Sequence, residues 1–277
     1  MKLTDLLTSD QPERIATGFQ FTEGPLWHPD GYLLFSDIPA DRIYKWSPDG
    51  ELEVFRQPSG NSNGLTLDRL GRLIACEHGH RRVSRTEADG SVDPLATHYQ
   101  GKRLNSPNDV VVTSDGSIYF TDPPYGVQPE ERELDFQGVY RIGAEGTLTL
   151  LADDFERPNG LAFSPSERIL YVDDTPRRHV RAFDVLADGT LANGRAFAEM
   201  QSPASGGPDG MKLDVQGNLY VTGAGGTWLF DPDGHHLGTL VTPEQPANLA
   251  FGGADRRTLY ITARTSVYRV RTRLPGA

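Results

Sequence analysis

The sequence has a single cysteine, Cys76, among its 277 residues. One cysteine excludes a disulfide within the chain and is typical of a protein from a reducing compartment. We expect Cys76 to be a buried strand residue. The first residues, "MKLTDLLTSDQPER", also lack the apolar core and cleavage site of a signal peptide, because Asp5 interrupts the only apolar patch. These features predict a cytoplasmic protein.

Long apolar runs and an excess of basic residues are both missing. The sequence contains no stretch of about 18 apolar residues, so it has no helical membrane span. We therefore expect no membrane partner. The 27 Lys and Arg residues are outnumbered by 38 Asp and Glu residues, giving a net charge of -11. Nucleic-acid binding depends on basic patches that neutralise phosphates, so the composition argues against such a partner. An acidic chain instead favours attraction of a cation.

Helical periodicity is absent as well, and a repeated strand pattern takes its place. Segments such as "NDVVVTSDGSIYFTD" and "DGMKLDVQGNLYVTG" start on a polar residue, alternate in steps of two, turn, and enter a second strand. Six such units start at Glu23, Asn63, Asn108, Asn159, Asp209 and Asn248, with spacings of 40, 45, 51, 50 and 39 residues. A period of this length with about four strands per unit indicates propeller blades.

The predicted fold is an all-β six-bladed β-propeller with four-stranded antiparallel blades, one domain over residues 1–277. The sixth unit supplies only three strands, "ANLAF", "TLYIT" and "SVYRVRT". We expect the fourth to be "ERIATGF", which precedes the first unit. The N- and C-terminal strands would then share one blade and remove an open sheet edge.

The six unit starts are expected to converge at the central channel, because the first strand of each propeller blade lines it. Two carboxylates and four amides directed to one point are costly to bury unless a cation or water satisfies them. Oxygen-only ligands favour a hard cation, most naturally Ca²⁺. The alternative is that these Asn and Asp residues only cap strands or form Asx turns.

Two familiar catalytic patterns are not found. The sequence contains no G-x-S-x-G motif for a serine nucleophile. The His-Gly-His of "CEHGHRRV" lacks the H-E-x-x-H spacing of a zinc site. His78 in this segment is expected either to face a substrate or to be a loop histidine, and Arg81 and Arg82 to be solvated turn charges.

Four longer segments carry a family resemblance. They are "FTEGPLWHPDGYLLFSDIP", "GKRLNSPNDVVVTSDGSIYFTDPPYG", "RPNGLAFSP" and "PDGMKLDVQGNLYVTG", in this order and at blade spacing. Over nearly its whole length the chain resembles the gluconolactonase and senescence-marker-protein (regucalcin-like) group of six-bladed propellers. The passages "SPND" to "DPPYG" and "IACEHGHRRVSR" look closer to the bacterial gluconolactonases.

This resemblance implies a lactonase with one divalent metal ion at the top of the channel. The ligands carried over by motif are Glu23, Asn108, Asn159 and Asp209. The implied reaction is hydrolysis of a small-molecule sugar lactone, of the gluconolactone type, to the aldonic acid. The metal is expected to be Ca²⁺, with Mn²⁺, Mg²⁺ and Zn²⁺ as alternatives. The particular lactone and the oligomeric state stay open.

In the implied mechanism the metal polarises the lactone carbonyl and Asp209 assists attack by water, as ligand, base or both. Candidate substrate contacts are Arg103 and Asn105, on the loop that enters the third blade, Tyr125 in "DPPYG", and His78. Tyr125 begins an unusually long insertion, "YGVQPEERELDFQG". For these residues the alternative is surface-loop packing. The alternative function is a non-catalytic propeller that binds calcium or a partner through its rim.

Overall fold

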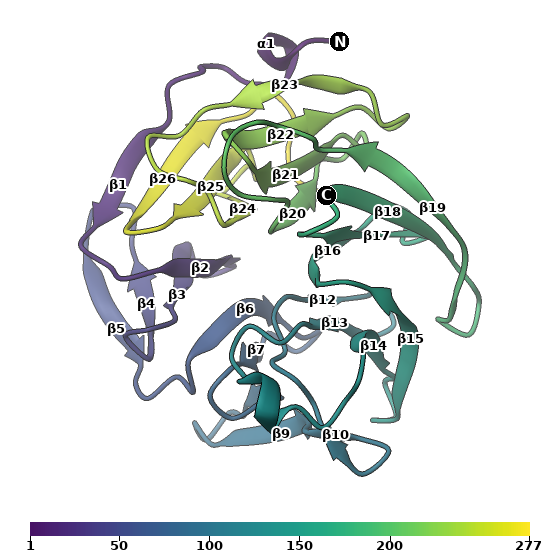
Figure 1. Cartoon of the computed structure of the whole chain (residues 1–277). Coiled ribbons are helices and arrows are strands. Elements are labelled where there is room, and N and C mark those ends of the chain that lie inside the picture. Colours follow the sequence, from purple (N-terminus) through teal and green to yellow (C-terminus); the bar gives the residue numbers. More distant parts are fainter.

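The computed structural model describes residues 1–277 and contains six four-stranded antiparallel sheets arranged around a central axis (Figure 1). The first blade contains β2 (Thr22–His28), β3 (Tyr32–Asp37), β4 (Arg42–Trp46) and β5 (Leu52–Arg56). The second contains β6 (Ser62–Leu67), β7 (Leu73–Glu77), β8 (Arg82–Thr86) and β9 (Val92–Ala96). The third contains β12 (Val110–Val112), β13 (Ile118–Asp122), β14 (Gln137–Ile142) and β15 (Leu148–Phe155).

The remaining blades repeat this up-and-down order. The fourth contains β16 (Pro158–Phe163), β17 (Ile169–Asp174), β18 (His179–Val185) and β19 (Leu191–Glu199). The fifth contains β20 (Met211–Leu213), β21 (Leu219–Gly223), β22 (Gly226–Phe230) and β23 (His236–Leu240). The sixth contains β24 (Asn248–Gly252), β25 (Thr258–Ala263), β26 (Ser266–Arg271) and the early strand β1 (Glu13–Thr17). The predicted six-bladed propeller is therefore confirmed.

Few elements lie outside the blades. They are α1 (Leu3–Leu6), the hairpin strands β10 (His98–Tyr99) and β11 (Lys102–Arg103), and the single 3₁₀ turn η1 (Pro129–Glu131). The two helical elements have four and three residues, so neither has the length and apolar character needed to cross a membrane. The turn η1 lies within the long insertion between β13 and β14 that the sequence predicts.

The two ends of the chain close the ring in the sixth blade, as predicted. Strand β1 pairs with β26 in antiparallel register, from Glu13 opposite Arg269 to Thr17 opposite Ser266. The Arg269 guanidinium donates to both carboxylate oxygens of Glu13, at 2.8 and 3.0 Å. Pairing the two ends removes the open edges that an incomplete blade would leave.

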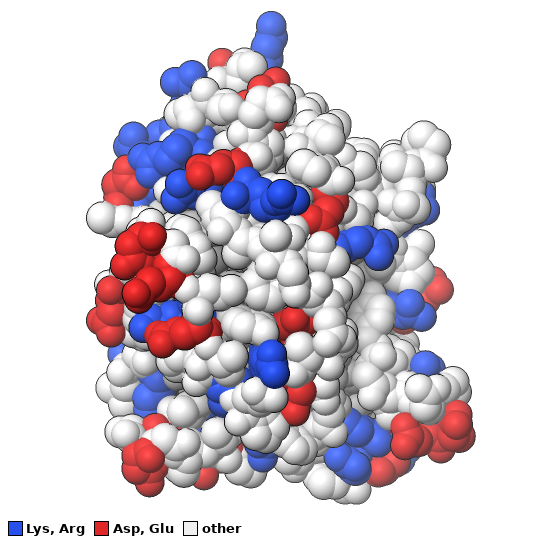
Figure 2. Space-filling view, turned by 90° about the vertical axis from the view of Figure 1, so that its left-hand side faces the viewer, with Lys and Arg blue, Asp and Glu red and all other residues white.

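The hydrophobic core is divided among the contacts between neighbouring blades. One cluster joins the first and last blades through Leu33, Phe35 and Trp46 on one side and Tyr260 and Val267 on the other. Cys76 is fully buried in the cluster between the second and third blades, as expected. Outside these contacts between blades, the side of the molecule seen in Figure 2 carries acidic and basic side chains interspersed with one another.

The glycine that follows a unit start allows the next blade to approach the first strand closely. A Cβ on Gly160 would lie 1.9 Å from the Asp209 carbonyl oxygen, and one on Gly24 would lie 2.0 Å from that of Asn63. Gly64 and Gly210 are confined in the same way by the third and sixth blades. The recurring Asn-Gly or Asp-Gly pair is thus a packing feature of inner strands, and Asn159–Gly160 lies inside β16 rather than at a hairpin turn.

Two inner strands begin later than the repeat suggests. In the third and fifth blades the regular strand starts at Val110 and Met211, two residues after Asn108 and Asp209. The two start residues are nevertheless held to the second strand of their blade. The Asn108 N–H donates to the Thr121 carbonyl at 2.9 Å, and the Asp209 N–H donates to that of Thr222 at 3.0 Å.

Candidate metal centre

The unit starts lie at one end of the central channel, which we call the carboxylate end. Hydrogen bonds between adjacent blades fix their backbones there. The Gly64 N–H donates to the Asn108 carbonyl at 2.8 Å, and the Thr121 hydroxyl donates to the Asn159 carbonyl at 2.7 Å. Of the six start side chains, five are buried, and Asp209 is partly exposed. The structure therefore brings residues from six distant parts of the chain to one place.

Glu23 is an acid in a poorly solvated position. Burial raises the pKa of Glu23 to about 7, and the negative charge of Asp109 acts in the same direction. Hydrogen bonds from the Gly24 N–H, at 2.8 Å, and from the Asn248 side chain favour the ionised form, as does the positive charge of Lys212. A cation placed beside this carboxylate would offset the cost of its desolvation.

Asp209 shares this electrostatic environment. Burial raises the pKa of Asp209 well above its usual range, and the charges of Glu23 and Asp109 raise it further. A hydrogen bond from the Asn159 side chain opposes the shift. Carboxyl groups with strongly raised pKa values are a frequent mark of functional sites, and a nearby cation would stabilise their ionised forms.

Unsatisfied oxygen atoms point to the same conclusion. Asn63 Oδ1 and Asp109 Oδ2 are buried and have no hydrogen-bond partner. Leaving such an acceptor unsatisfied costs about 1–3 kcal/mol each, so these atoms call for a ligand or water. The Asp109 charge acts on both Glu23 and Asp209, and all of these groups offer oxygen atoms, which suit a hard divalent cation. The residues present therefore fit a metal ion.

Asn159 is oriented by two hydroxyl groups. Its Nδ2 donates to the Tyr125 hydroxyl at 3.3 Å and to Thr175 Oγ1 at 3.2 Å. The Thr175 hydroxyl is itself fixed because it donates to the Pro208 carbonyl, next to Asp209, at 2.8 Å. With the amide nitrogen engaged in this way, the amide oxygen is available as a ligand.

A further carboxyl group, Asp173, lies behind the site. Its two oxygen atoms are fully buried without a hydrogen-bond partner, and Oδ2 lies 2.9 Å from the position of a Cβ on Gly160. Burial raises the pKa of Asp173 well above its usual range, and the charges of Asp209 and Asp109 add to this shift. The carboxylate end is therefore rich in acidic groups that solvent does not stabilise.

Two of the four candidate substrate residues lie next to the unit starts. The His78 ring is buried, and its Nε2 lies 3.4 Å from Asn63 Nδ2. Burial lowers the pKa of His78 to about 4, so the ring is neutral at pH 7. Tyr125 reaches Asn159 through its hydroxyl, and the Arg157 guanidinium lies over the Tyr125 ring at 5.1 Å from its centre. Burial raises the pKa of Tyr125 to about 12, so its hydroxyl keeps its proton.

The other two candidates bind main-chain groups. The Arg103 guanidinium donates to the His80 carbonyl at 3.1 Å. The Asn105 side chain is fully buried, and its Nδ2 donates to the carbonyls of Asp122 and Phe136. In this structure both residues connect the loop before the third blade to its surroundings, and the buried Asn105 Oδ1 has no hydrogen-bond partner.

The expectation that Arg81 and Arg82 are solvated turn charges is wrong. Arg81 is buried, and its Nε donates to the carbonyls of Leu104 and Asn105 at 2.8 and 3.0 Å. Arg82 pairs with the buried carboxylate of Glu77 at 2.7 Å. The acceptors of Arg81 lie on the distant loop before the third blade, which no short-range pattern reveals, and the partner of Arg82 lies in the same hairpin at a strand end whose burial the local sequence does not show.

Another group of ligand-type side chains is Asp231, Asp233 and His235, in the turn between β22 and β23. The turn uses them internally, because Asp231 accepts hydrogen bonds from the backbone of Asp233 and His235 and from the His235 ring. Asp233 and His235 are exposed, and the group is separate from the channel.

Sequence reasoning missed Asp109 and Thr175. Asp109 follows Asn108 at a position where four of the other five units have glycine. An alignment of the repeats could therefore have singled out Asp109. Thr175 carries no such signal, because its role depends on the approach of Tyr125 from the long insertion.

Comparison with known proteins places these observations in context. Residues 21–265 match the family model described as the SMP-30/gluconolactonase/LRE-like region. The chain is 36% identical to a gluconolactonase from Zymomonas mobilis over 95% of this chain and 82% of that protein. It is 30% identical to a pentonolactonase from Haloferax volcanii, with 90% and 83% covered. A solved gluconolactonase from Xanthomonas campestris superposes with a TM-score of 0.89 at 37% identity, covering 98% of this chain and 92% of that one.

Proposed function

This chain belongs to the SMP-30/gluconolactonase/LRE-like family, and we propose that it is a metal-dependent lactonase that opens sugar lactones of the gluconolactone type to aldonic acids. The observation that carries the metal requirement is the pair of poorly solvated carboxylates, Glu23 and Asp209, beside two unsatisfied buried oxygen atoms. An oxygen donor set of this kind is matched by a divalent cation, and Ca²⁺ fits best.

We propose that Glu23, Asn108, Asn159 and Asp209 hold the metal ion. When bound, a divalent cation in such a site polarises a carbonyl oxygen and makes a water molecule more acidic. The loss of a proton from that water requires a base. Asp209 is the group we assign to this step, because it is the carboxylate of the site that is partly open to solvent.

The surrounding residues prepare Asp209 and the lactone for this step. The hydrogen bond from Asn159 stabilises the ionised Asp209 carboxylate, and the Tyr125 and Thr175 hydroxyls hold the Asn159 amide in place. We assign neutral His78 and protonated Tyr125 to contacts with the substrate hydroxyls that add no charge. We assign Arg103 and Asn105 to holding the loop that precedes Asn108.

The proposal is tested by hydrolysis of glucono-1,5-lactone, followed by proton release in a weakly buffered solution. We expect turnover to disappear with a chelator and to return with Ca²⁺, Mn²⁺, Mg²⁺ or Zn²⁺ to different extents. Glu23→Gln should remain folded and lose turnover, whereas Asp30→Asn, in the exposed turn between β2 and β3, should match the wild type. Calcium binding without hydrolysis of any aldonolactone in a panel would contradict the proposal and indicate a binding propeller.

A further inference from the structure

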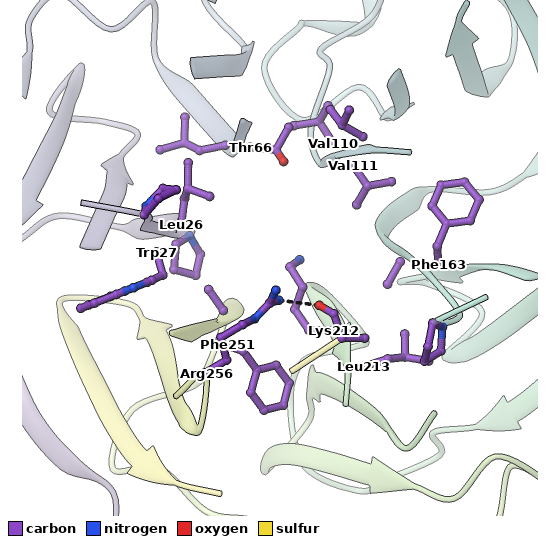
Figure 3. A pocket seen from close by; sticks show the side chains of 18 of the residues that line it. Leu26, Trp27, Thr66, Val110, Val111, Phe163, Lys212, Leu213, Phe251 and Arg256 are labelled. Atoms are coloured by element: carbon purple, nitrogen blue, oxygen red, sulfur yellow. Dashed lines mark hydrogen bonds between the residues drawn. The ribbon is translucent and has the colours of Figure 1, made fainter. Parts of the chain in front are cut away.

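A cavity of about 600 Å³ opens at the end of the channel opposite the carboxylates. We call it the distal cavity. Its walls come from the same inner strands, further along each one: Leu65 lies two residues after Asn63, and Lys212 lies three residues after Asp209. Because a strand advances about 3.3 Å per residue, the floor of the distal cavity lies several ångströms from the unit starts. Figure 3 shows side chains from all six blades surrounding this space.

The walls of the distal cavity combine apolar side chains with exposed polar groups. The apolar side chains include Leu26, Trp27, Val110, Val111, Phe163 and Phe251 (Figure 3). A volume of this size is typical of sites for small organic ligands. Against the apolar side chains, sugar hydroxyls would lose hydrogen bonds to water without replacing them. This part of the cavity is suited to the apolar body of a small compound.

None of the charged side chains that line the cavity forms an ion pair with another side chain, and Lys212 is the one whose charge reaches the carboxylate end. Three ionisable side chains line the space: Glu167, Lys212 and Arg256. Glu167 accepts hydrogen bonds from the Ser114 N–H and hydroxyl, and Arg256 donates to the main chain of Ala277. Lys212 donates only to the Met211 carbonyl, at 2.9 Å, and forms no ion pair.

The position of Lys212 follows from the strand that carries it. Met211 and Leu213, on either side, pack in the core between the fourth and fifth blades, so the intervening side chain of β20 leaves that core and enters the channel. Its charge is felt by Glu23 at the carboxylate end. Lys212 thus stands between the two ends of the channel, with apolar walls on the distal side.

We propose that the distal cavity is a second ligand site, for a small apolar carboxylate whose carboxylate group pairs with Lys212. An apolar ring or chain would fill the space between Leu26, Val111 and Phe251, while the anionic group reaches the ammonium at the inner end. The site has a different lining from the proposed metal centre, and Lys212 is the one residue of it whose charge also acts on Glu23.

The test uses 2-naphthoate as the probe and the uncharged 2-naphthalenemethanol as its comparator, with binding measured by calorimetry. We expect the wild type to bind 2-naphthoate in the micromolar to low millimolar range. Lys212→Met keeps a long apolar side chain and should weaken 2-naphthoate binding about tenfold, the equivalent of roughly 1.4 kcal/mol, while binding of the neutral comparator changes little. Lys102→Met, an exposed lysine of β11, is the matched control and should bind like the wild type.

A second experiment fills the distal cavity with a larger side chain. Thr66→Phe adds a ring inside the space and should abolish binding of both compounds; Val111→Phe serves if Thr66→Phe is destabilised, as judged by thermal unfolding. Lactone hydrolysis by the cavity-filling variant should be retained, which separates this proposal from the lactonase one. Unchanged 2-naphthoate affinity in Lys212→Met or in the filled variants, or no binding to the wild type at about 1 mM, would overturn the proposal.

Discussion

Asp209 combines a ligand position with partial exposure, and this makes its role separable by experiment. Asp209→Asn keeps the size and one oxygen ligand but removes the negative charge and the basic lone pair. We expect metal affinity to weaken modestly and turnover to fall by about a hundredfold to ten-thousandfold at full metal occupancy, the usual worth of general-base assistance. The measurement is lactone hydrolysis over a metal titration with occupancy determined independently. Turnover near that of the wild type at saturating metal would assign the proton to Glu23 or to bulk water.

Asn159 tests whether the metal site and the fold are independent. Asn159→Ala removes an amide that donates to Tyr125 and Thr175 and favours the ionised Asp209 carboxylate, and leaves the pairing of β16 with β17 in place. We expect a folded protein whose calcium affinity, measured by calorimetry, is at least tenfold weaker. Thermal unfolding of this variant should gain less from added metal than that of the wild type, because stabilisation follows binding to the native state. A variant that fails to fold while chelated wild type stays stable would make Asn159 structural.

At the residue scale, sequence reasoning worked where one signal repeats and failed where a contact depends on distant chain. The unit starts were found because six copies of one pattern made each more informative than any single Asn-Gly. The sequence suggests that Asn159 and Tyr125 both belong to the site but does not predict the hydrogen bond between them. It gives no sign that Arg81 is buried, because the acceptors of Arg81 lie on the loop before the third blade.

At the scale of the element, the glycine that follows four of the six starts controls how close two inner strands can lie. Gly160→Ala places a Cβ 1.9 Å from the Asp209 carbonyl oxygen, so the backbone of the fifth blade must shift. We expect a loss of about 1–3 kcal/mol in the free energy of unfolding, which is typical of overpacking, together with a strong loss of turnover as Asp209 is displaced.

A matched variant separates these two effects. Gly116→Ala lies in the turn between β12 and β13, where Gly116 has φ +87° and no atom approaches the added Cβ closer than 3.9 Å. Backbone strain there should cost about 1–2 kcal/mol, a similar loss of stability, without affecting turnover. If both variants lost turnover equally, the close packing at Gly160 would have no special connection with the site.

The strands themselves were predictable because alternation and turn residues are local properties. The irregular starts of β12 and β20 were not, since they depend on hydrogen bonds to Thr121 and Thr222 in the neighbouring strand. The same limit applies to the insertion after Tyr125: its length was evident, but its contact with Ser106 through the Gly126 N–H was not.

On the scale of the whole molecule, closure of the ring was predictable from a counting argument, because the sixth unit lacked one strand and the first residues supplied it. The two ends of the channel, by contrast, could not be told apart by sequence alone. Carboxylates gather at one end and apolar side chains at the other because the unit starts and the residues that follow them occupy successive levels of the same inner strands.

The carboxylate end also makes global stability depend on pH in a way that a single variant can isolate. In the metal-free protein the pKa of Glu23 is raised from 4.5 to about 7, so between these values the native state holds a proton that the unfolded chain has released. Its contribution to stability is therefore present at low pH and is lost as pH rises through this window. A shift of this size corresponds to about 3 kcal/mol.

Comparing the wild type with Glu23→Gln removes the titrations that do not depend on Glu23, and leaves those of Glu23 and of Asp209, whose pKa the Glu23 charge raises. His78, whose pKa is lowered to about 4, and Asp122, whose pKa burial raises to about 7, are common to both proteins and cancel in the difference. In the presence of a chelator, we expect the variant to gain up to about 3 kcal/mol in stability relative to the wild type between pH 4.5 and pH 8, by chemical denaturation. Saturating calcium should reverse the order at pH 8, because the ionised Glu23 then has a cation beside it. A stability difference that does not change with pH would mean that Glu23 is already ionised in the metal-free protein, and the proposed cost of burying it would be wrong.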